Sequence, residues 1–206
     1  MMLRHSPLLP VHRHMGATIG DFHGWAAPLR FDSPELEAAR VRRSCGLSDH
    51  SWMVKLDLKA LAFPDLPDSD NRCAWWPLGP GHVLATCEPP ERASTQEKIN
   101  SLLGPVYCTD VTSVYADLLL AGPATRKVLS KLTALDVSAE ALADLACGQT
   151  SVAHVHAIVL RQDMNATPAF HVLVGRDVAE SVWEAVLSAG REFDIAAFGL
   201  EARALI

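Results

Sequence analysis

The pattern of apolar and polar residues predicts a helix and a strand in the first quarter of the chain. Residues 34–45 form the helix, with Ser33 as its N-cap and Pro34 in its first turn. Gly46 suits the left-handed position that ends a helix. Residues 52–58 alternate apolar and charged side chains, which is typical of a half-buried strand. The apolar side of the helix is expected to comprise Leu36, Ala39, Val41 and Cys45.

The middle of the chain predicts a hairpin. Residues 73–77 and 82–87 are its strands, and a glycine–proline turn joins them. Trp75 and Trp76 then point to opposite faces of the first strand. They could stack a flat ligand, but one of two adjacent strand tryptophans is normally buried. Residues 59–72 carry two prolines and several acids and are expected to be irregular.

Shorter signals complete this half. Residues 1–19 contain two prolines and are expected to form a short arm. Ser94, with Glu97 three residues later, has the spacing of a capping box and predicts a helix that ends at about residue 103.

The C-terminal half predicts the order β-α-β-β-α-β. Strands are expected at residues 115–121, 150–161, 169–175 and 193–196, and helices at 122–132 and 177–188. This order is the split βαβ, ferredoxin-like arrangement, in which both helices cover one face of an antiparallel sheet. The linking residues 133–148 are expected to hold a short helix capped at Ser138. The predicted fold class is α+β: a single domain over residues 1–206, with lobes at about 1–112 and 113–206.

Composition excludes several classes of protein. Apolar residues make up 49% and charged residues 20%, which is enough for a real core and argues against disorder. The net charge is −6 and there is no long basic run, so no nucleic-acid partner is expected. No window approaches the roughly 20 apolar residues that span a bilayer, so no membrane association is expected. The first residues lack the apolar region of a signal peptide.

Cysteine and histidine spacing gives little sign of a metal site. The five cysteines lie far apart and form no C-x-x-C pair, which indicates reduced thiols in a cytoplasmic protein. The pairs His12/His14 and His154/His156 could chelate a metal if each lay on one strand face. The simpler interpretation is exposed histidines, because no carboxylate lies at a fitting spacing. We therefore expect no metal ligand.

The stretch DFHGWAAPLRFDSPELEAARVRRSCGLSDHSWMVKLDL, residues 21–58, resembles the N-terminal signature of the glycine-cleavage T-protein (aminomethyltransferase) superfamily. That signature runs approximately DF-x-GWEMP, followed by a helix with an acidic start that ends VRR-x-x-GLFD-x-SHMGK. Residues 116–129, ADLLLAGPATRKVL, are similar to the apolar strand and glycine–proline helix start of the same family. Residues 198–206, FGLEARALI, are similar to its segment GLGARD-x-LR. The resemblance covers only the N-terminal, folate-binding part of a longer protein.

This resemblance implies a two-lobed, folate-binding aminomethyltransferase-like domain that holds tetrahydrofolate in a central cavity, as a transferase of one-carbon metabolism. In the family, an aspartate polarises the folate nitrogen and a glutamate binds the pterin ring. Met53 and Ser51 match the methionine and serine of SHM, with Trp52 in place of the histidine, and Arg203 matches the arginine of GLGARD. The predicted cofactor-binding residues are therefore Met53, Ser51 and Arg203.

The residues that carry the family's chemistry differ in this chain. The hairpin motif GG-x-x-DD corresponds to NRCAWWPLGPGHVLATC, which has no acid, and Cys87 stands in place of an asparagine. The segment GYTGEDGFE corresponds to LRQDMNATPAFH, which has no glutamate, although Asp163 lies nearby. General acid–base catalysis contributes about 10²–10⁴-fold, so we predict no catalytic residue and weak or no catalysis by the chain alone.

Two functions stay open at this point. The first is a folate-binding protein of the aminomethyltransferase class that binds tetrahydrofolate or a one-carbon adduct. The second is a non-catalytic structural or assembly subunit with a protein partner, since the gamma subunit of heterotetrameric sarcosine oxidase is similar in length and carries a similar glycine–proline hairpin. A metal-dependent protein that uses His154 and His156 is a distant third.

The candidate residues also have simpler structural interpretations. Met53 could belong to the core, and Arg203 could be an ion-paired surface group. Asp21 could serve as an acid in a pocket or hold its own loop. Asp49 is expected to accept hydrogen bonds from turn amides.

Overall fold

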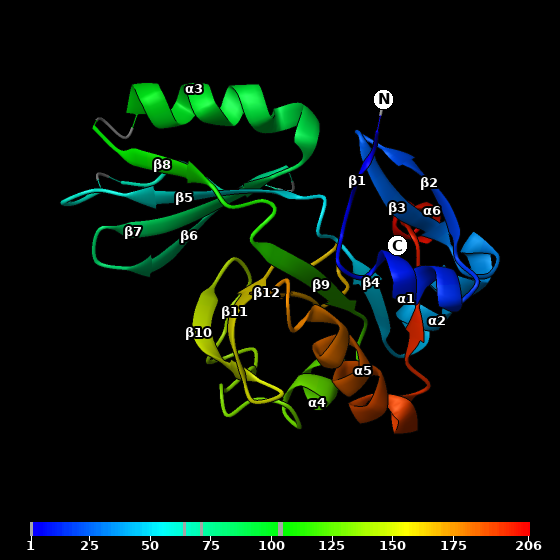
Figure 1. The fold of residues 1–206 in the computed structure, drawn as a ribbon. Coiled ribbons are helices and arrows are strands. Elements are labelled where there is room, and N and C mark those ends of the chain that lie inside the picture. The colour runs from blue at the N-terminus through cyan, green and yellow to red at the C-terminus, as the bar shows by residue number, and fades with distance from the viewer. Residues whose placement is uncertain (1, 64, 71, 103–104) are drawn as a thin grey trace.

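The computed structural model of the chain describes residues 2–63, 65–70, 72–102 and 105–206. Its strands form a three-stranded sheet (β1-β3-β2), a six-stranded sheet (β10-β11-β12-β9-β4-β13) and a four-stranded sheet (β6-β7-β5-β8), as Figure 1 shows. The strands are β1 (Arg4–His5), β2 (Thr18–Phe22), β3 (Trp25–Arg30), β4 (Gly46–Asp49), β5 (Val54–Lys59), β6 (Cys73–Gly79), β7 (His82–Cys87), β8 (Tyr107–Asp110), β9 (Tyr115–Ala121), β10 (Cys147–Val152), β11 (Val155–Arg161), β12 (Ala169–Gly175) and β13 (Ala196–Ala197). The α-helices are α1 (Leu9–His14), α2 (Pro34–Arg43), α3 (Arg92–Leu102), α4 (Thr125–Leu129), α5 (Ala179–Ala189) and α6 (Leu200–Arg203).

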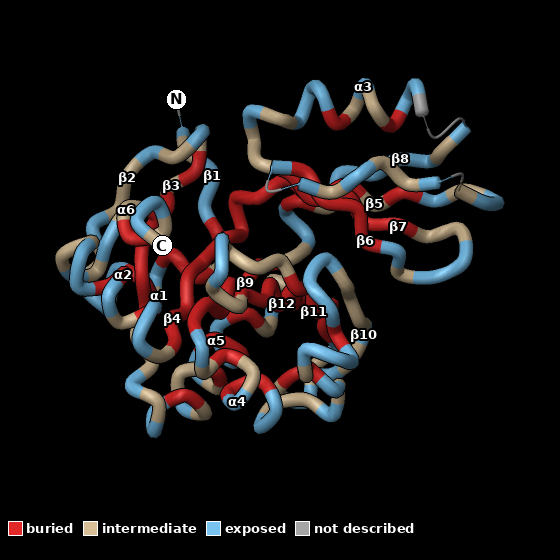
Figure 2. The backbone as a smooth tube through the Cα atoms, turned by 180° about the vertical axis from the view of Figure 1, so that it is seen from behind, coloured by how far each residue is buried: buried red, intermediate tan, exposed pale blue. Residues whose placement is uncertain are grey.

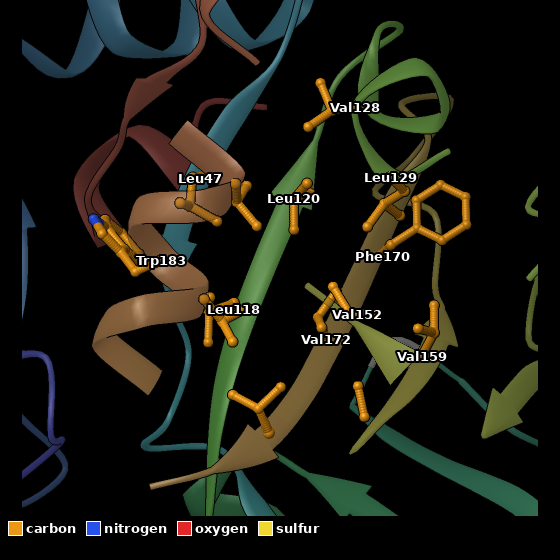
Figure 3. Close-up of a cluster of buried hydrophobic side chains, with 14 of the residues drawn as sticks. Leu47, Leu118, Leu120, Val128, Leu129, Val152, Val159, Phe170, Val172 and Trp183 are labelled. Carbon is orange, nitrogen blue, oxygen red and sulfur yellow. The ribbon is translucent and has the colours of Figure 1, made fainter. Parts of the chain in front are cut away.

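The six-stranded sheet carries the main core. α4 and α5 cover one of its faces, where Leu118, Leu120 and Phe170 of the sheet share a cluster with Val128 and Trp183 of the helices (Figure 3). Alternate strand residues point to the opposite face, because successive side chains of a strand alternate in direction. Figure 2 shows buried positions following β4, β9 and β12 through the centre of the molecule. The α+β class is therefore confirmed.

The predicted hairpin is also confirmed. β6 and β7 pair antiparallel, and both tryptophans of β6 are buried. Trp75 packs within the four-stranded sheet and against Ile99 of α3. Trp76 points the other way and packs against Ile158 and Leu173 of the six-stranded sheet. Trp76 therefore joins the two sheets, and both indoles belong to cores.

The ferredoxin-like detail of the C-terminal half is not confirmed. The predicted strand 150–161 is two strands, β10 and β11, which form a hairpin around Ala153 and His154. Both turn residues have positive φ, 49° and 68°, without the glycine or asparagine that usually signals such a turn. In addition, β4 lies between β9 and β13. The sheet thus contains a strand from the N-terminal half that local sequence did not assign to it.

The division into lobes stays a prediction. The boundary at residue 112 falls between β8 of the four-stranded sheet and β9 of the six-stranded sheet. However, β4 precedes that boundary and is an inner strand of the six-stranded sheet. In the described part of the chain, no helix is long and apolar enough to cross a membrane.

Helix α2 confirms its predicted start and corrects its end. The Ser33 hydroxyl accepts a hydrogen bond from the Leu36 amide at 3.3 Å, as an N-cap does. The helix ends at Arg43, and Gly46 begins β4 instead of ending the helix in the left-handed conformation. Glycine is needed at position 46 because Phe198 packs closely there: a Cβ would lie 2.6 Å from a ring carbon of Phe198.

The buried face of α2 also differs from the prediction. Leu36 and Ala39 are exposed, whereas Ala38, Val41 and Glu37 are buried. The Glu37 carboxylate accepts hydrogen bonds from three backbone amides, those of Phe31 (2.6 Å), Asp32 (2.6 Å) and Gly199 (2.7 Å). These bonds explain how a carboxylate replaces an apolar residue on the inner face, because they satisfy it where water cannot reach.

Three further local predictions were wrong. The expected arm at residues 1–19 contains β1 and α1, with Pro10 in the first helical turn, where it costs no hydrogen bond. α3 begins at Arg92, so Ser94 lies inside the helix and does not cap it. Residues 133–146 form turns and bends instead of a helix, and residues 147–148 begin β10, although the Ser138 hydroxyl accepts a bond from the Ala141 amide at 3.2 Å. The predicted helix that ends at about residue 103 is formed as α3, but local spacing did not specify where it begins, nor whether a helix forms after Ser138.

Candidate functional site

A pocket of about 300 Å³ opens where segments from both ends of the chain meet. The turn between β4 and β5, the loop between β11 and β12, and α6 supply most of its wall. The lining residues are Phe22, His50, Met53, Leu119, Gln162, Asp163, Met164, Asn165, His171, Leu200, Arg203 and Ala204. Two other hollows, of about 610 and 620 Å³, are larger but more open. Asp32 lines both of them, and Arg40, 3.4 Å from Asp32, lines the first. The smaller pocket is the candidate site because buried polar groups converge on it.

Two of the three predicted binding residues line this pocket. Met53 is 6% exposed and lies in the turn after β4. Arg203 lies at the end of α6; its guanidinium is 2.9 Å from Glu88 and stands over the Trp52 ring at 5.5 Å. The structural and the binding interpretations therefore hold together for each residue. Met53 is buried in the core and also lines the pocket, and Arg203 is ion-paired and also lines the pocket. Stacking on Trp52 and pairing with Glu88 fix the direction of the guanidinium.

Ser51, the third predicted residue, lies behind the wall. Its hydroxyl donates to Asp49 at 2.6 Å and accepts from the Asp117 amide at 3.2 Å. It is 2% exposed and is not among the lining residues. These bonds hold the β4–β5 turn against β9, so Ser51 positions its neighbours His50 and Met53.

Sequence reasoning missed a group of buried histidines at the pocket. His171, on β12, lines the pocket, and its Nδ1 is bonded to Asp117 of neighbouring β9, at 2.9 Å and 3.1 Å from the two carboxylate oxygens. His50, from the turn after β4, is fully buried and also lines the pocket. Among the described residues, neither ring nitrogen of His50 has a hydrogen-bond partner. The His50 and His171 rings have centroids 5.6 Å apart.

The charges around His50 favour its neutral form. Burial lowers its pKa well below the usual 6.5, and the positive charges of Arg203 and Lys55 lower the pKa further. Lys55 is itself fully buried and donates to the backbone oxygens of Met53 (2.8 Å) and Ser51 (3.2 Å). Burial lowers the pKa of Lys55, which the nearby aspartates partly offset. The lining of the pocket therefore includes an uncharged imidazole, His50, with the buried Lys55 close enough to affect its pKa.

The one carboxylate among the described lining residues is engaged in the protein. Asp163 is held by Arg161, with nitrogen–oxygen distances of 3.1 Å and 2.7 Å, and accepts from the Ala169 amide at 3.2 Å. Such two-point pairing fixes the orientation of a carboxylate and occupies both of its oxygens. Asp163 therefore shapes the pocket rim and is poorly placed to act as an acid or base.

The other aspartates have structural roles. Asp21 accepts a hydrogen bond from the Gly24 amide at 2.8 Å and closes the β2–β3 turn. Asp49 accepts from the Ser51 amide at 3.0 Å, as predicted, and is also bonded to His12 at 2.9 Å. The second of these contacts was not foreseen.

No metal site is formed in the described part of the chain, where no group of three or more histidine, cysteine or acidic side chains is placed to hold an ion. His154 lies in the turn between β10 and β11, and His156 is exposed on β11. None of the five cysteines, all of them described, is in a disulfide.

One sequence signal marks each residue of the missed histidine–aspartate pair as a polar group in an apolar strand, but does not pair them. Asp117 is an acid within the apolar run ADLLLA, and His171 is a histidine within AFHVLV. A polar residue at a strand position that alternation buries needs a partner. The register that pairs Leu173 with Asp117 and His171 with Leu119 makes the two residues diagonal neighbours on one face. Only the strand pairing, which local sequence does not specify, identifies the partner.

Comparisons with known proteins agree on one family. The family model described as the GCVT N-terminal domain matches residues 76–206. The aminomethyltransferase of Geobacillus thermodenitrificans is 31% identical over 98% of this chain and 62% of its own length. That of Acidobacterium capsulatum is 29% identical over 98% of this chain and 61% of its own length. The chain thus spans less than two thirds of the length of these relatives.

Two solved structures share the fold. The glycine cleavage system aminomethyltransferase T from Bartonella henselae has a TM-score of 0.74 at 17% identity, over 98% of this chain and 61% of that chain. A chain of the heterotetrameric sarcosine oxidase from Corynebacterium sp. U-96 has a TM-score of 0.61 at 20% identity, over 79% of this chain and 95% of that one. At these identities the likeness concerns the fold alone.

Proposed function

The chain belongs to the GCVT N-terminal domain family, and on that premise we propose that its pocket binds tetrahydrofolate or a one-carbon adduct of tetrahydrofolate. One observation carries the proposal. Met53 and Arg203 lie far apart in sequence and match separate family segments, yet they line the same pocket. Nothing local to either segment requires this convergence, which is expected if both segments serve one ligand.

The chemistry of the pocket supports a flat ligand with polar edges. Its volume, about 300 Å³, is at the lower end of the range for small-molecule sites. Apolar side chains such as Leu119 and Met164 alternate with the amides of Gln162 and Asn165. A reduced pterin ring has apolar faces and a hydrogen-bonding edge, which matches this mixture. The ligand's acidic tail would be attracted by Arg203 at the mouth.

We propose binding with weak or no turnover by this chain alone. The β6–β7 hairpin has no acid, and Asp163 is occupied by Arg161. General acid–base catalysis requires a free group within hydrogen-bond reach of the reacting nitrogen. The cytoplasmic location expected from the cysteines is part of the same proposal.

A second function has one specific observation in its favour. The chain covers 95% of a chain in a heterotetrameric sarcosine oxidase. A protein of this size and fold can therefore be one subunit of a larger assembly, and we propose a non-catalytic assembly subunit as the alternative. Size-exclusion chromatography with light scattering tests it: a strictly monomeric protein that forms no complex with its candidate partners counts against this alternative.

Calorimetry with tetrahydrofolate and 5-formyltetrahydrofolate tests the main proposal. The wild-type protein should bind at least one of them, and Arg203→Ala should bind about tenfold more weakly, because a charge-assisted contact is lost. Arg13→Ala is the matched control, since Arg13 is exposed on α1 and lies outside the pocket lining. No heat at about 1 mM ligand would sink the proposal, since it limits affinity to the millimolar range.

A further inference from the structure

The buried imidazole of His50 has no explanation within the fold. It is fully buried, it lines the pocket, and neither nitrogen is bonded to any described residue. Buried polar groups are normally hydrogen-bonded, and an unsatisfied one destabilises the protein. A side chain in this state at the floor of a pocket is expected to find its partner on a ligand. In neutral form it offers one N–H donor and one lone pair.

His171 offers the complementary group. Its Nδ1 is bonded to the carboxylate of Asp117, which can only accept. The hydrogen of the neutral ring therefore lies on Nδ1, and Nε2 keeps a lone pair. The pairing fixes both the tautomer and the ring orientation, as a carboxylate does for a histidine in other sites. Nε2 is then the nitrogen available to the pocket.

Together the two rings present an acceptor and a donor to one ligand. Their centroids are 5.6 Å apart and their planes are inclined by 62°. Two such groups can reach adjoining positions on the edge of a single small ring. A metal ion is a poorer partner for them, since no third histidine, cysteine or acid in the described part joins them in a possible metal cluster.

We propose that His50 and His171 recognise the lactam edge, –NH–C(=O)–, of a planar heterocycle, with His171 Nε2 accepting from the ring N–H and a His50 nitrogen donating to the carbonyl oxygen. Asp117 is a positioning residue that sets the polarity of His171. The inference rests on the proposed function in taking a 4-oxopteridine as the heterocycle. It goes further in assigning the edge to two histidines, neither of which sequence comparison selected as a binding residue.

The test compares two ligands that differ only at this edge. 2-Amino-4-oxopteridine carries the lactam, whereas 2,4-diaminopteridine has a ring nitrogen acceptor beside an amino donor. The wild-type protein should bind the 4-oxo compound about tenfold or more tightly, because the wrong pattern leaves buried groups unpaired. A wild-type protein that binds both equally, or prefers the diamino compound, overturns the inference.

Two variants assign the preference to the histidines. In His50→Phe the preference should fall to within about twofold, since the carbonyl loses its donor. In Asp117→Asn the side-chain amide can donate to Nδ1, which moves the histidine hydrogen to Nε2, so the preference should shift toward the diamino compound. If Asp117 had only a structural role, Asp117→Asn would bind both ligands more weakly by the same factor. His156→Phe, at an exposed position of β11, is the matched control and should keep the wild-type ratio.

The outcomes separate this inference from the proposed function. If the wild-type protein binds 5-formyltetrahydrofolate but His50→Phe and Asp117→Asn keep the wild-type ratio for the two pteridines, the inference fails and folate binding stands. If the wild-type protein binds neither folates nor pteridines, both fail. If the ratio collapses in His50→Phe and shifts in Asp117→Asn, the two histidines recognise the lactam.

Discussion

Two buried histidine–aspartate pairs lie on opposite faces of the six-stranded sheet. Asp49 of β4 is bonded to His12 at 2.9 Å, and Asp117 of β9 is bonded to His171 at 2.9 Å. β4 and β9 are neighbours, and the register pairs Asp49 with Leu118, so Asp49 shares the face of Leu118 while Asp117 faces the other way. The Asp49–His12 pair is enclosed within the fold and is called the sealed pair. The Asp117–His171 pair lies at the pocket and is called the open pair.

The sealed pair fastens the N-terminal segment to the sheet. Asp49 accepts bonds from His12, the Ser6 hydroxyl and both the amide and hydroxyl of Ser51. The His12 ring stands edge-on to Trp183 at 5.0 Å. The cavity beside Ser6 and Asp49 has a volume of about 10 Å³, which is no more than one water needs.

The open pair has the features of a site. His171 reaches a pocket of about 300 Å³, and the unpartnered His50 lies beside it. A buried histidine–aspartate pair is therefore not in itself a functional signature. His12 Nδ1 also lacks a partner among the described residues, so an unsatisfied nitrogen alone does not mark a site. What distinguishes the site is space for a ligand beside an imidazole, His50, neither of whose nitrogens is bonded.

The largest expected effect is a loss of folding stability when the sealed pair is broken. Asp49→Ala should lower the free energy of unfolding by about 3–5 kcal/mol, because it leaves a buried imidazole and two hydroxyls unpaired. Urea denaturation measures this loss. Asp21→Ala, which removes one exposed turn bond, is the control and should cost about 1 kcal/mol or less. A loss for Asp49→Ala no larger than that of the control would show that the sealed pair contributes little.

His50, beside the open pair, and Asp49, in the sealed pair, should affect the free energy of unfolding in different pH ranges. Burial lowers the pKa of His50 below 6.5. Below that pH the unfolded state therefore binds a proton at His50, whereas the folded state does not. The loss of stability linked to protonation of His50 is therefore absent above pH 6.5 and grows below it, by up to about 1.4 kcal/mol per pH unit. His50→Phe should remove this loss. Equal slopes for wild type and variant between about pH 6.5 and 5 would contradict the assignment.

Asp49 acts in a lower range. Burial tends to raise its pKa, but the hydrogen bond and charge of His12 and the hydroxyls of Ser51 and Ser6 outweigh burial and hold the pKa below 3.8. Its contribution is therefore present above pH 3.8 and is lost as pH falls through the lower folded-state value.

A smaller effect, a gain in folding stability, is expected when His50 itself is replaced. His50→Phe at pH 7.5 should raise the free energy of unfolding by about 1 kcal/mol, since it replaces an unbonded buried imidazole by an apolar ring. The same variant should bind the ligand more weakly. His12→Phe is the matched change on the sealed side and should destabilise the protein, because Asp49 loses its partner. A stability loss in both variants would erase the distinction between the two sides.

The smallest effect concerns the pocket mouth. Glu88→Gln should change the free energy of unfolding by no more than about 0.5–1 kcal/mol, because the Arg203–Glu88 pair is about a quarter exposed. Ligand affinity should fall a few-fold, since the guanidinium loses its orientation. Glu97→Gln, an exposed change on α3, serves as the control in calorimetry. An unchanged affinity would show that stacking on Trp52 alone orients Arg203.

The sequence by itself determined the features that depend on near neighbours. The Ser33 cap is a local hydrogen bond, the β6–β7 hairpin follows from alternation around a turn, and β9 has the predicted bounds 115–121. The family signature selected Met53 and Arg203, which both line the pocket, because it preserves residue order and spacing; that they bind a cofactor stays a prediction. Each of these signals lies within a stretch of a few to about forty residues.

Tertiary structure decided the rest. The place of β4 between β9 and β13, the sharp turn at Ala153 and His154, and the buried Glu37 all depend on contacts distant in sequence. So does the site: His50 and His171 meet only because β4, β9 and β12 are neighbours in one sheet. Spacing specifies which side of a strand a residue occupies, but the pairing of strands alone specifies what it faces there. For this reason the sealed and the open histidine–aspartate pairs could not be told apart, or found, before the sheet was assembled.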